Sequence, residues 1–223
     1  KRDLEKKKQE KRLAKQQKKE ERKNSGNQGQ MVRKYMAMRL KQWENEPNDA
    51  RVKGELAQLR HGIGKKPGEV PEMWELLFNG FPEELMSRNG EPSWAEWAVS
   101  LSLCMYALHQ QGSDIHQNNM HSEQQSLGKA VRKLAALQDE SELARIRKRF
   151  TVFATSADME ECAYYLRGLV QLLRAKGVPM DYIQLAYDLY QFQTENGAQK
   201  VKLRWGQDFY RVVKQEEEKK ENE

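Results

Sequence analysis

Residues 94–111, WAEWAVSLSLCMYALHQQ, decide the fold. Ser93 precedes them as a helix-starting residue, and apolar side chains then occur on almost every side of the expected helix. A helix without a polar face has to be surrounded by other elements. The stretch therefore predicts a buried helix at the centre of the first of two helical lobes.

The residues before this helix favour three more helices. Residues 30–45 have apolar side chains near helical spacing, and Asn48 or Asp49 can cap a helix that runs to about residue 61. Glycines and a proline between residues 62 and 68 form a loop, and Pro71 starts a short helix over 71–79. One apolar stripe supports the second of these helices: Val52, Leu56, Leu59 and Ile63.

The residues after it favour five helices, over 126–138, 142–153, 157–176, 180–194 and 198–213. Ser141 and Ser156 are the expected caps of the second and third, and Gly177 ends the third. The chain has no convincing alternating strand pattern. The expected fold class is all-α.

The expected architecture is a two-lobed helical bundle with a charged N-terminal extension. Residues 112–122, GSDIHQNNMHS, are polar and contain Gly and Asn, which favours a hinge. The predicted parts are a charged helical or disordered extension (1–27), an N-terminal helical lobe (28–111), the hinge (112–122), a C-terminal helical lobe (123–213) and an acidic tail (214–223).

Positive charge is concentrated at the N-terminus. The whole chain has a net charge of +6, but residues 1–24 alone contribute +7 and residues 214–223 contribute −2. The body in between is therefore almost neutral, at +1. A nucleic-acid site on the body has to come from segregation of charge on its surface.

Three stretches of the body are locally basic, namely 51–66, 129–149 and 200–214, whereas 69–96 contain seven Glu against Arg88. Ordinary solvated helix faces would explain any one of these stretches. Together they are typical of a phosphate-binding face opposed to a protein-binding face. The five Trp residues lie among apolar residues at helical spacing. The first interpretation is that they pack in the core, and the second is that they act as platforms for stacking bases.

The sequence offers little chemistry for an enzyme. It has no phosphate-binding Gly-rich loop, no nucleophile elbow and no HExxH pair. Cys104 and Cys162 are expected to be buried free thiols, and His109, His116 and His121 to lie in a solvated polar loop rather than at a metal. With no catalytic residue, cofactor, metal or membrane span expected, the prediction is a cytoplasmic, non-enzymatic protein.

Several segments then resemble one known family. Ala57–Gly62 (AQLRHG) is similar to an ALRRG-type segment, and Ser126–Ala130 (SLGKA) is similar to an SLG(R/K)AL box. Val201–Tyr210 (VKLRWGQDFY) resembles a closing VRxRWxxDFY helix. In this order they resemble the CasB family, the small subunit of the type I-E CRISPR surveillance complex Cascade, over roughly residues 30–212.

The resemblance implies a subunit present in two copies, which contacts other Cascade subunits and guide RNA. It also implies sequence-independent binding of single-stranded and double-stranded DNA, so that the displaced non-target strand is held and the R-loop stabilised. His61 departs from the family pattern, which has a second Arg there, and residues 1–24 have no counterpart. The expected nucleic-acid-binding residues are Arg60, His61, Lys129, Arg132, Arg145, Arg149, Lys200, Lys202 and Arg204.

Two other interpretations stay open at this point. The first is a helical protein-interaction scaffold that uses the acidic 69–96 region and has no nucleic-acid role. The second, an enzyme such as a nuclease, lacks the acidic or histidine constellation that it would need.

Overall fold

The described part of the chain is helical. The computed structural model describes residues 26–136 and 139–220, with side chains up to Arg211. Within these ranges there is no strand, and His121 and Met180 form an isolated bridge, so the all-α prediction is confirmed. Residues 26–45 are helical and are called here the 26–45 helix. The further elements are α2 (Asp49–His61), η1 (Pro71–Met73), α3 (Trp74–Phe78), η2 (Glu83–Leu85), α4 (Trp94–His109), α5 (Leu127–Arg132), α6 (Glu140–Ala154), α7 (Met159–Lys176), α8 (Tyr182–Phe192) and α9 (Gly197–Lys220).

Helix α4 is the centre of the molecule. Ser93 caps it in a reciprocal arrangement, because the Ser93 hydroxyl accepts from Glu96 N at 3.1 Å and the Glu96 carboxylate accepts from Ser93 N at 2.6 Å. Every residue from Ala98 to Gln110 is buried. The helix packs against α2 on the N-terminal side and against α7 and α8 from the C-terminal half. It therefore joins both halves of one core instead of organising the first half alone.

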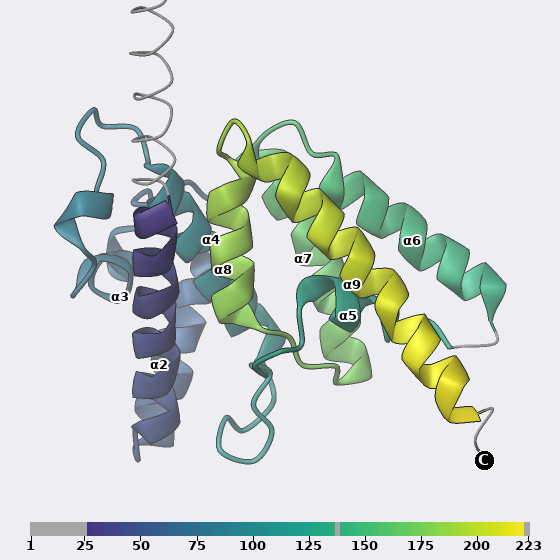
Figure 1. Ribbon diagram of the computed structural model, residues 1–223. Coiled ribbons are helices and arrows are strands. Elements are labelled where there is room, and N and C mark those ends of the chain that lie inside the picture. The colour runs from purple at the N-terminus through teal and green to yellow at the C-terminus, as the bar shows by residue number, and fades with distance from the viewer. Residues whose placement is uncertain (1–25, 137–138, 221–223) are drawn as a thin grey trace, which may run out of the picture.

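The second half is organised around aromatic residues of α9. Phe150 of α6 stacks 5.7 Å from Phe209, and Phe153 lies 4.9 Å from Trp205, so α6 and α9 run antiparallel side by side (Figure 1). Helix α5 crosses α9 so closely that a Cβ atom on Gly128 would lie 2.4 Å from the carbonyl oxygen of Trp205. The glycine of the SLGKA segment is thus required by this helix crossing.

Several helix ends differ from the sequence-based expectation. Helix α5 ends at Arg132 instead of about residue 138, and α9 continues to Lys220, beyond the expected end at 213. The caps of α6 and α7 are Asp139 and Asp158, not the expected serines. An aspartate caps as well as a serine does, and the Ser156 hydroxyl instead donates to the carbonyl oxygen of Phe153 at 2.7 Å.

The connection over residues 112–122 is held in place by buried side chains and by hydrogen bonds. Ile115 and Met120 are buried, and the Gln110 amide donates to the carbonyl oxygens of Ser113 and Asn118 at 3.1 and 3.0 Å. The domain boundaries stay a prediction, and most of the expected 1–27 extension lies outside the described residues. Among the described helices, none combines the length and apolarity that a membrane span requires.

The three histidines near this connection are not the solvated cluster that the sequence suggested. His109 is fully buried in α4, with Nδ1 2.9 Å from the Tyr182 hydroxyl. His121 accepts from Tyr182 N at 3.2 Å, whereas exposed His116 pairs with Asp49 at 3.1 Å. The expected buried helix over 94–111 already included His109, so the assignment of this histidine to a solvated loop conflicted with that helix.

Burial of His109 predicts loss of stability in weak acid. Burial, assisted by nearby Arg174, lowers the pKa of His109 to about 4, whereas an imidazole in the unfolded chain takes up a proton near pH 6.5. Between these values protons bind the unfolded state more strongly, so the free energy of unfolding falls as the pH falls. We expect a loss of about 2 kcal/mol between pH 7 and pH 5. Urea unfolding at both pH values, compared with His109→Gln, measures it; an equal loss in the variant contradicts this assignment.

Candidate nucleic-acid interface

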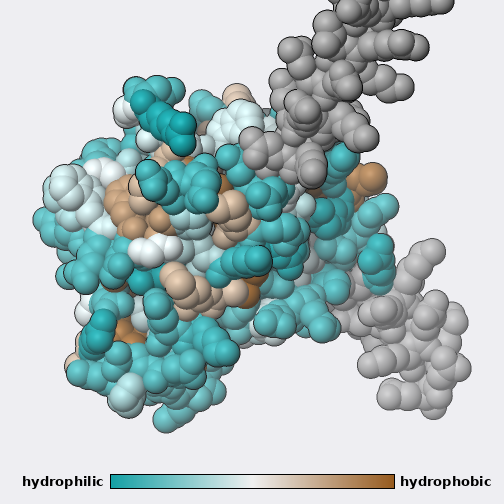
Figure 2. Space-filling model, turned by 60° about the vertical axis from the view of Figure 1, so that its left-hand side comes forward, coloured by the Kyte–Doolittle hydropathy of each residue, from teal (hydrophilic) through white to brown (hydrophobic). Residues whose placement is uncertain are grey.

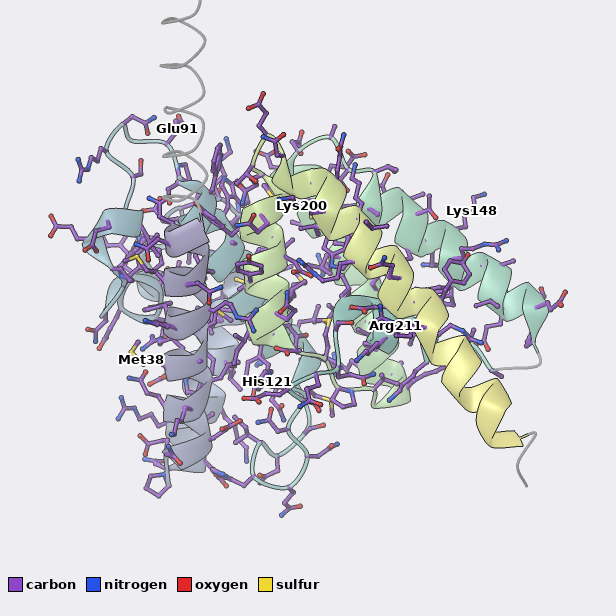
Figure 3. The ribbon with its side chains drawn as sticks, viewed as in Figure 1. Met38, Glu91, His121, Lys148, Lys200 and Arg211 are labelled. Carbon is purple, nitrogen blue, oxygen red and sulfur yellow. The ribbon has the colours of Figure 1, made fainter. Side chains whose placement is uncertain are left out.

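Exposed cations gather on two neighbouring helices of the C-terminal half. Lys200 and Lys202 lie at the start of α9, and Figure 3 shows Lys200 there with Lys148 on α6. Ile146, Phe150 and Phe153 anchor one side of α6 in the core. We call these six exposed side chains the C-terminal basic surface: Arg145, Arg147, Lys148, Arg149, Lys200 and Lys202.

The charges of this surface are not neutralised locally. Among the described residues, none of the six has a carboxylate oxygen within 4.0 Å of its charged nitrogens. The ammonium of Lys202 lies over an aromatic ring, with Nζ 5.4 Å from the centroid of the Phe192 ring. Unpaired, exposed lysine and arginine side chains can displace the counterions that are condensed on a phosphate backbone. The release of these counterions drives binding.

Arg204 has a different role from its neighbours on α9. Its guanidinium pairs with Asp188, whose side chain is 1% exposed and also accepts from the Trp205 indole at 2.7 Å and the Gln184 amide at 2.6 Å. Burial raises the pKa of Asp188, and Arg204 opposes that shift. The charge of Arg204 thus helps to hold α8 against α9, and its contact with nucleic acid stays a prediction.

Arg132 is also a structural residue. It is only 2% exposed, and its Nη1 donates to the carbonyl oxygen of Ala135 at 3.1 Å, just beyond the end of α5. A phosphate cannot reach it without opening this helix end. Lys129, one turn earlier, is half-buried and donates to the carbonyl oxygen of Gln124 at 3.0 Å, which leaves it at the margin of the site.

Arg60 and His61 lie elsewhere, at the end of α2. Arg60 is half-buried and donates to the carbonyl oxygen of Ala107 at 3.2 Å, in the last turn of α4. Burial and the nearby charge of Arg174 lower the pKa of Arg60. Since α2 packs on α4, α4 on α8 and α8 on α9, two helices separate Arg60 and His61 from α9. The predicted residues thus lie at two places, the end of α2 and the helices α5, α6 and α9.

The sequence interpretation missed Arg174 and Arg33. Arg174 donates to the carbonyl oxygen of Gln111 and lies beside Arg60. Arg33 donates to Gln184 at 2.7 Å, and both Arg33 and Arg204 lie over the ring of Tyr187, at 5.3 and 5.9 Å from its centroid. No local spacing signals these contacts, because they join residues far apart in the chain.

Both cysteines are buried, and potential metal-ligating side chains are dispersed within the described ranges. Cys104 and Cys162 are buried free thiols, as predicted, and burial raises the pKa of both to about 12. No group of three or more His, Cys, Asp or Glu side chains within the described ranges could hold a metal ion. The exposed chemistry of this part of the chain is electrostatic.

Comparisons with known proteins place these features in a family context. Residues 55–210 match the family model described as CRISPR-associated protein Cse2. The chain is similar to the crystal structure of CasB from Thermobifida fusca, with 30% identity over 80% of this chain and 97% of that chain and a TM-score of 0.65. Comparison with the curated proteins gives no match.

Two further solved structures show the same fold. The M. ruber CasB structure is 23% identical, with coverage of 83% of this chain and 96% of that chain and a TM-score of 0.60. A Cse2-family CRISPR-associated protein from Thermus thermophilus is 21% identical, with coverage of 80% and 97% and a TM-score of 0.59. These coverages extend over nearly the whole length of both relatives.

Proposed function

Because the chain belongs to the CRISPR-associated protein Cse2 family, we propose that it is the small subunit of a type I-E Cascade. In this role it assembles with the other Cascade subunits, the guide RNA and a second copy of itself in the cytoplasm. It is non-catalytic, and it holds the displaced non-target DNA strand so that the R-loop is stabilised. Its contacts are to the nucleic-acid backbone and carry no sequence preference.

The observation that carries this proposal is the C-terminal basic surface. Six exposed cations lie on the adjoining helices α6 and α9, and none has a carboxylate partner among the described residues. Exchange of a DNA duplex for an RNA–DNA duplex is nearly balanced in free energy, so modest contacts to the displaced strand shift it. The residues proposed to bind are Arg145 and Arg149 on α6 and Lys200 and Lys202 on α9, with Lys129 at the margin.

The cations at the end of α2 are a secondary part of the proposal. Arg60 and His61 lie there, and Arg174 adds a further positive charge beside them. On this proposal the group contacts a different segment of nucleic acid from the one bound at α9. Arg132 and Arg204 serve as supports within the fold.

Salt dependence tests the proposal on the isolated chain. If four to six phosphates are neutralised, the logarithm of the association constant for single-stranded DNA should fall with the logarithm of salt concentration, with a slope of about −3 to −4. Fluorescence anisotropy with two labelled oligonucleotides of unrelated sequence measures the slope and the sequence preference together. A flat salt response, or no binding at the lowest salt, would overturn the proposal in favour of a pure protein scaffold.

A further inference from the structure

A polar hollow lies on the opposite half of the molecule from the C-terminal basic surface. Its volume is about 820 Å³, and it is bounded by the 26–45 helix, α2 and α3. Arg39, Trp43, Arg51 and Leu76 are among its lining residues, and Met38, labelled in Figure 3, lies at its edge with 37% of its surface exposed. Figure 2 brings this side forward and shows mostly hydrophilic side chains with small apolar patches between them.

Arg39 is the unusual residue of this hollow. It is 8% exposed, its Nη2 donates to the carbonyl oxygen of Leu76 at 2.6 Å, and its Nη1 donates to the side-chain oxygen of Gln42 at 3.1 Å. Its Nε has no hydrogen-bond partner in the structure. Within the described ranges no carboxylate oxygen lies within 4.0 Å of the guanidinium. A buried guanidinium without a counter-charge is costly, and a carboxylate brought to it would offset that cost.

The acidic residues of the hollow nearest α2 are already occupied. Arg51 pairs with Glu46 at 3.2 Å and with Glu55 at 3.0 Å, and the Trp43 indole donates to Glu55 at 2.8 Å. These contacts fix both carboxylates toward α2. Arg39 is consequently a buried cation of the hollow that no described carboxylate pairs with, and exposed Lys41 of the same helix also lines the hollow.

The surroundings favour a protein side chain over a nucleic-acid backbone. Glu46 and Glu75 line the hollow together with Arg39, and a run of phosphates passing them would be repelled. A single carboxylate avoids that repulsion, and basic neighbours on the same peptide would be attracted to these glutamates. Met38 and Leu76 offer apolar contact to the stem of such a side chain.

We propose that this hollow is a protein-docking site in which Arg39 receives one Asp or Glu side chain of a partner, flanked on that partner by basic residues. The site is independent of the proposed nucleic-acid surface. It assigns the two halves of the molecule to different tasks, with protein contact at the 26–45 helix and DNA contact at α6 and α9.

The test measures the affinity of the full chain for two short peptides, acetyl-Lys-Glu-Lys-amide and acetyl-Lys-Gln-Lys-amide. Each peptide is titrated calorimetrically at the same fixed ionic strength. The glutamate peptide is expected to bind at least about tenfold more tightly, which is the effect of one charge-assisted hydrogen-bonded pair. Arg39→Met should abolish the preference. Lys34→Met, which removes an exposed cation from the same helix outside the hollow, should retain it.

A second pair of variants keeps the test valid if Arg39→Met fails to fold. Met38 is partly exposed, so Met38→Glu and Met38→Gln should both fold, and only the glutamate should weaken binding of the acidic peptide. Equal or undetectable binding of the two peptides, or a preference that survives in Arg39→Met, overturns the proposal. Tighter binding of inorganic phosphate than of the glutamate peptide also overturns it, because the site would then be a phosphate site.

Discussion

Replacing Asp188 with alanine is expected to lower the free energy of unfolding by about 3–5 kcal/mol. The Asp188 side chain is almost completely buried and accepts hydrogen bonds from Gln184, Arg204 and Trp205. Without it, the Arg204 guanidinium and the Trp205 indole lose their acceptor between α8 and α9. An uncompensated charge beside the core costs far more than the contact itself contributed.

Chemical denaturation of the Asp188→Ala variant measures this loss. Glu195→Ala, which removes an exposed carboxylate from the connection between the same two helices, is the control and should change stability by less than about 0.5 kcal/mol. Arg204→Met should also destabilise the chain, because it removes the cation that pairs with buried Asp188. A loss under about 1 kcal/mol in Asp188→Ala would show that this network does not hold α8 to α9.

Reversing four charges of the C-terminal basic surface is expected to reduce the affinity for single-stranded DNA by about a hundredfold or more at low salt. The variant carries Arg145→Glu, Arg149→Glu, Lys200→Glu and Lys202→Glu. All four side chains are exposed, so the fold should persist, although loss of the Lys202 contact with Phe192 costs about 0.5–1 kcal/mol. Anisotropy titrations should show the same loss for oligonucleotides of unrelated sequence.

The matched control reverses four exposed cations elsewhere on the chain and so has the same net charge. It carries Lys34→Glu, Lys41→Glu, Lys53→Glu and Arg88→Glu. Affinity in the control should fall by less than about tenfold, through long-range repulsion alone. Equal losses in the two variants would mean that net charge, and not the surface on α6 and α9, determines binding.

Much of the fold follows from local sequence patterns. The apolar run after Ser93 predicted a buried helix, and a buried helix is what residues 94–109 form. Competing caps were harder to rank, because Asp139 and Ser141 both precede a helical pattern and only tertiary packing decides between them. The early end of α5 depends on long-range contacts, such as that of Lys176 with the carbonyl oxygen of Leu134 at 2.6 Å.

The site was less predictable than the fold. Charge counting along the chain identified Lys200, Lys202 and Arg204 together. It could not tell that Arg204 pairs with the buried carboxylate of Asp188, sixteen residues earlier, whereas the two lysines are exposed. The same limit explains Arg132. An arginine is expected at the surface from its residue type, but this one is buried like a core residue. Buried cations such as Arg39 have no sequence signature, since their environment is assembled from three separate elements.

The most direct test of the account is photocrosslinking from α9 in a reconstituted Cascade bound to target DNA. A benzophenone amino acid replaces Leu203, which is 63% exposed and lies between Lys202 and Arg204, or Trp74, which is 52% exposed in the acidic region. The account predicts crosslinks from position 203 to the displaced non-target strand and none from position 74. Crosslinks to that strand from position 74, or from position 203 only to protein or guide RNA, would contradict it.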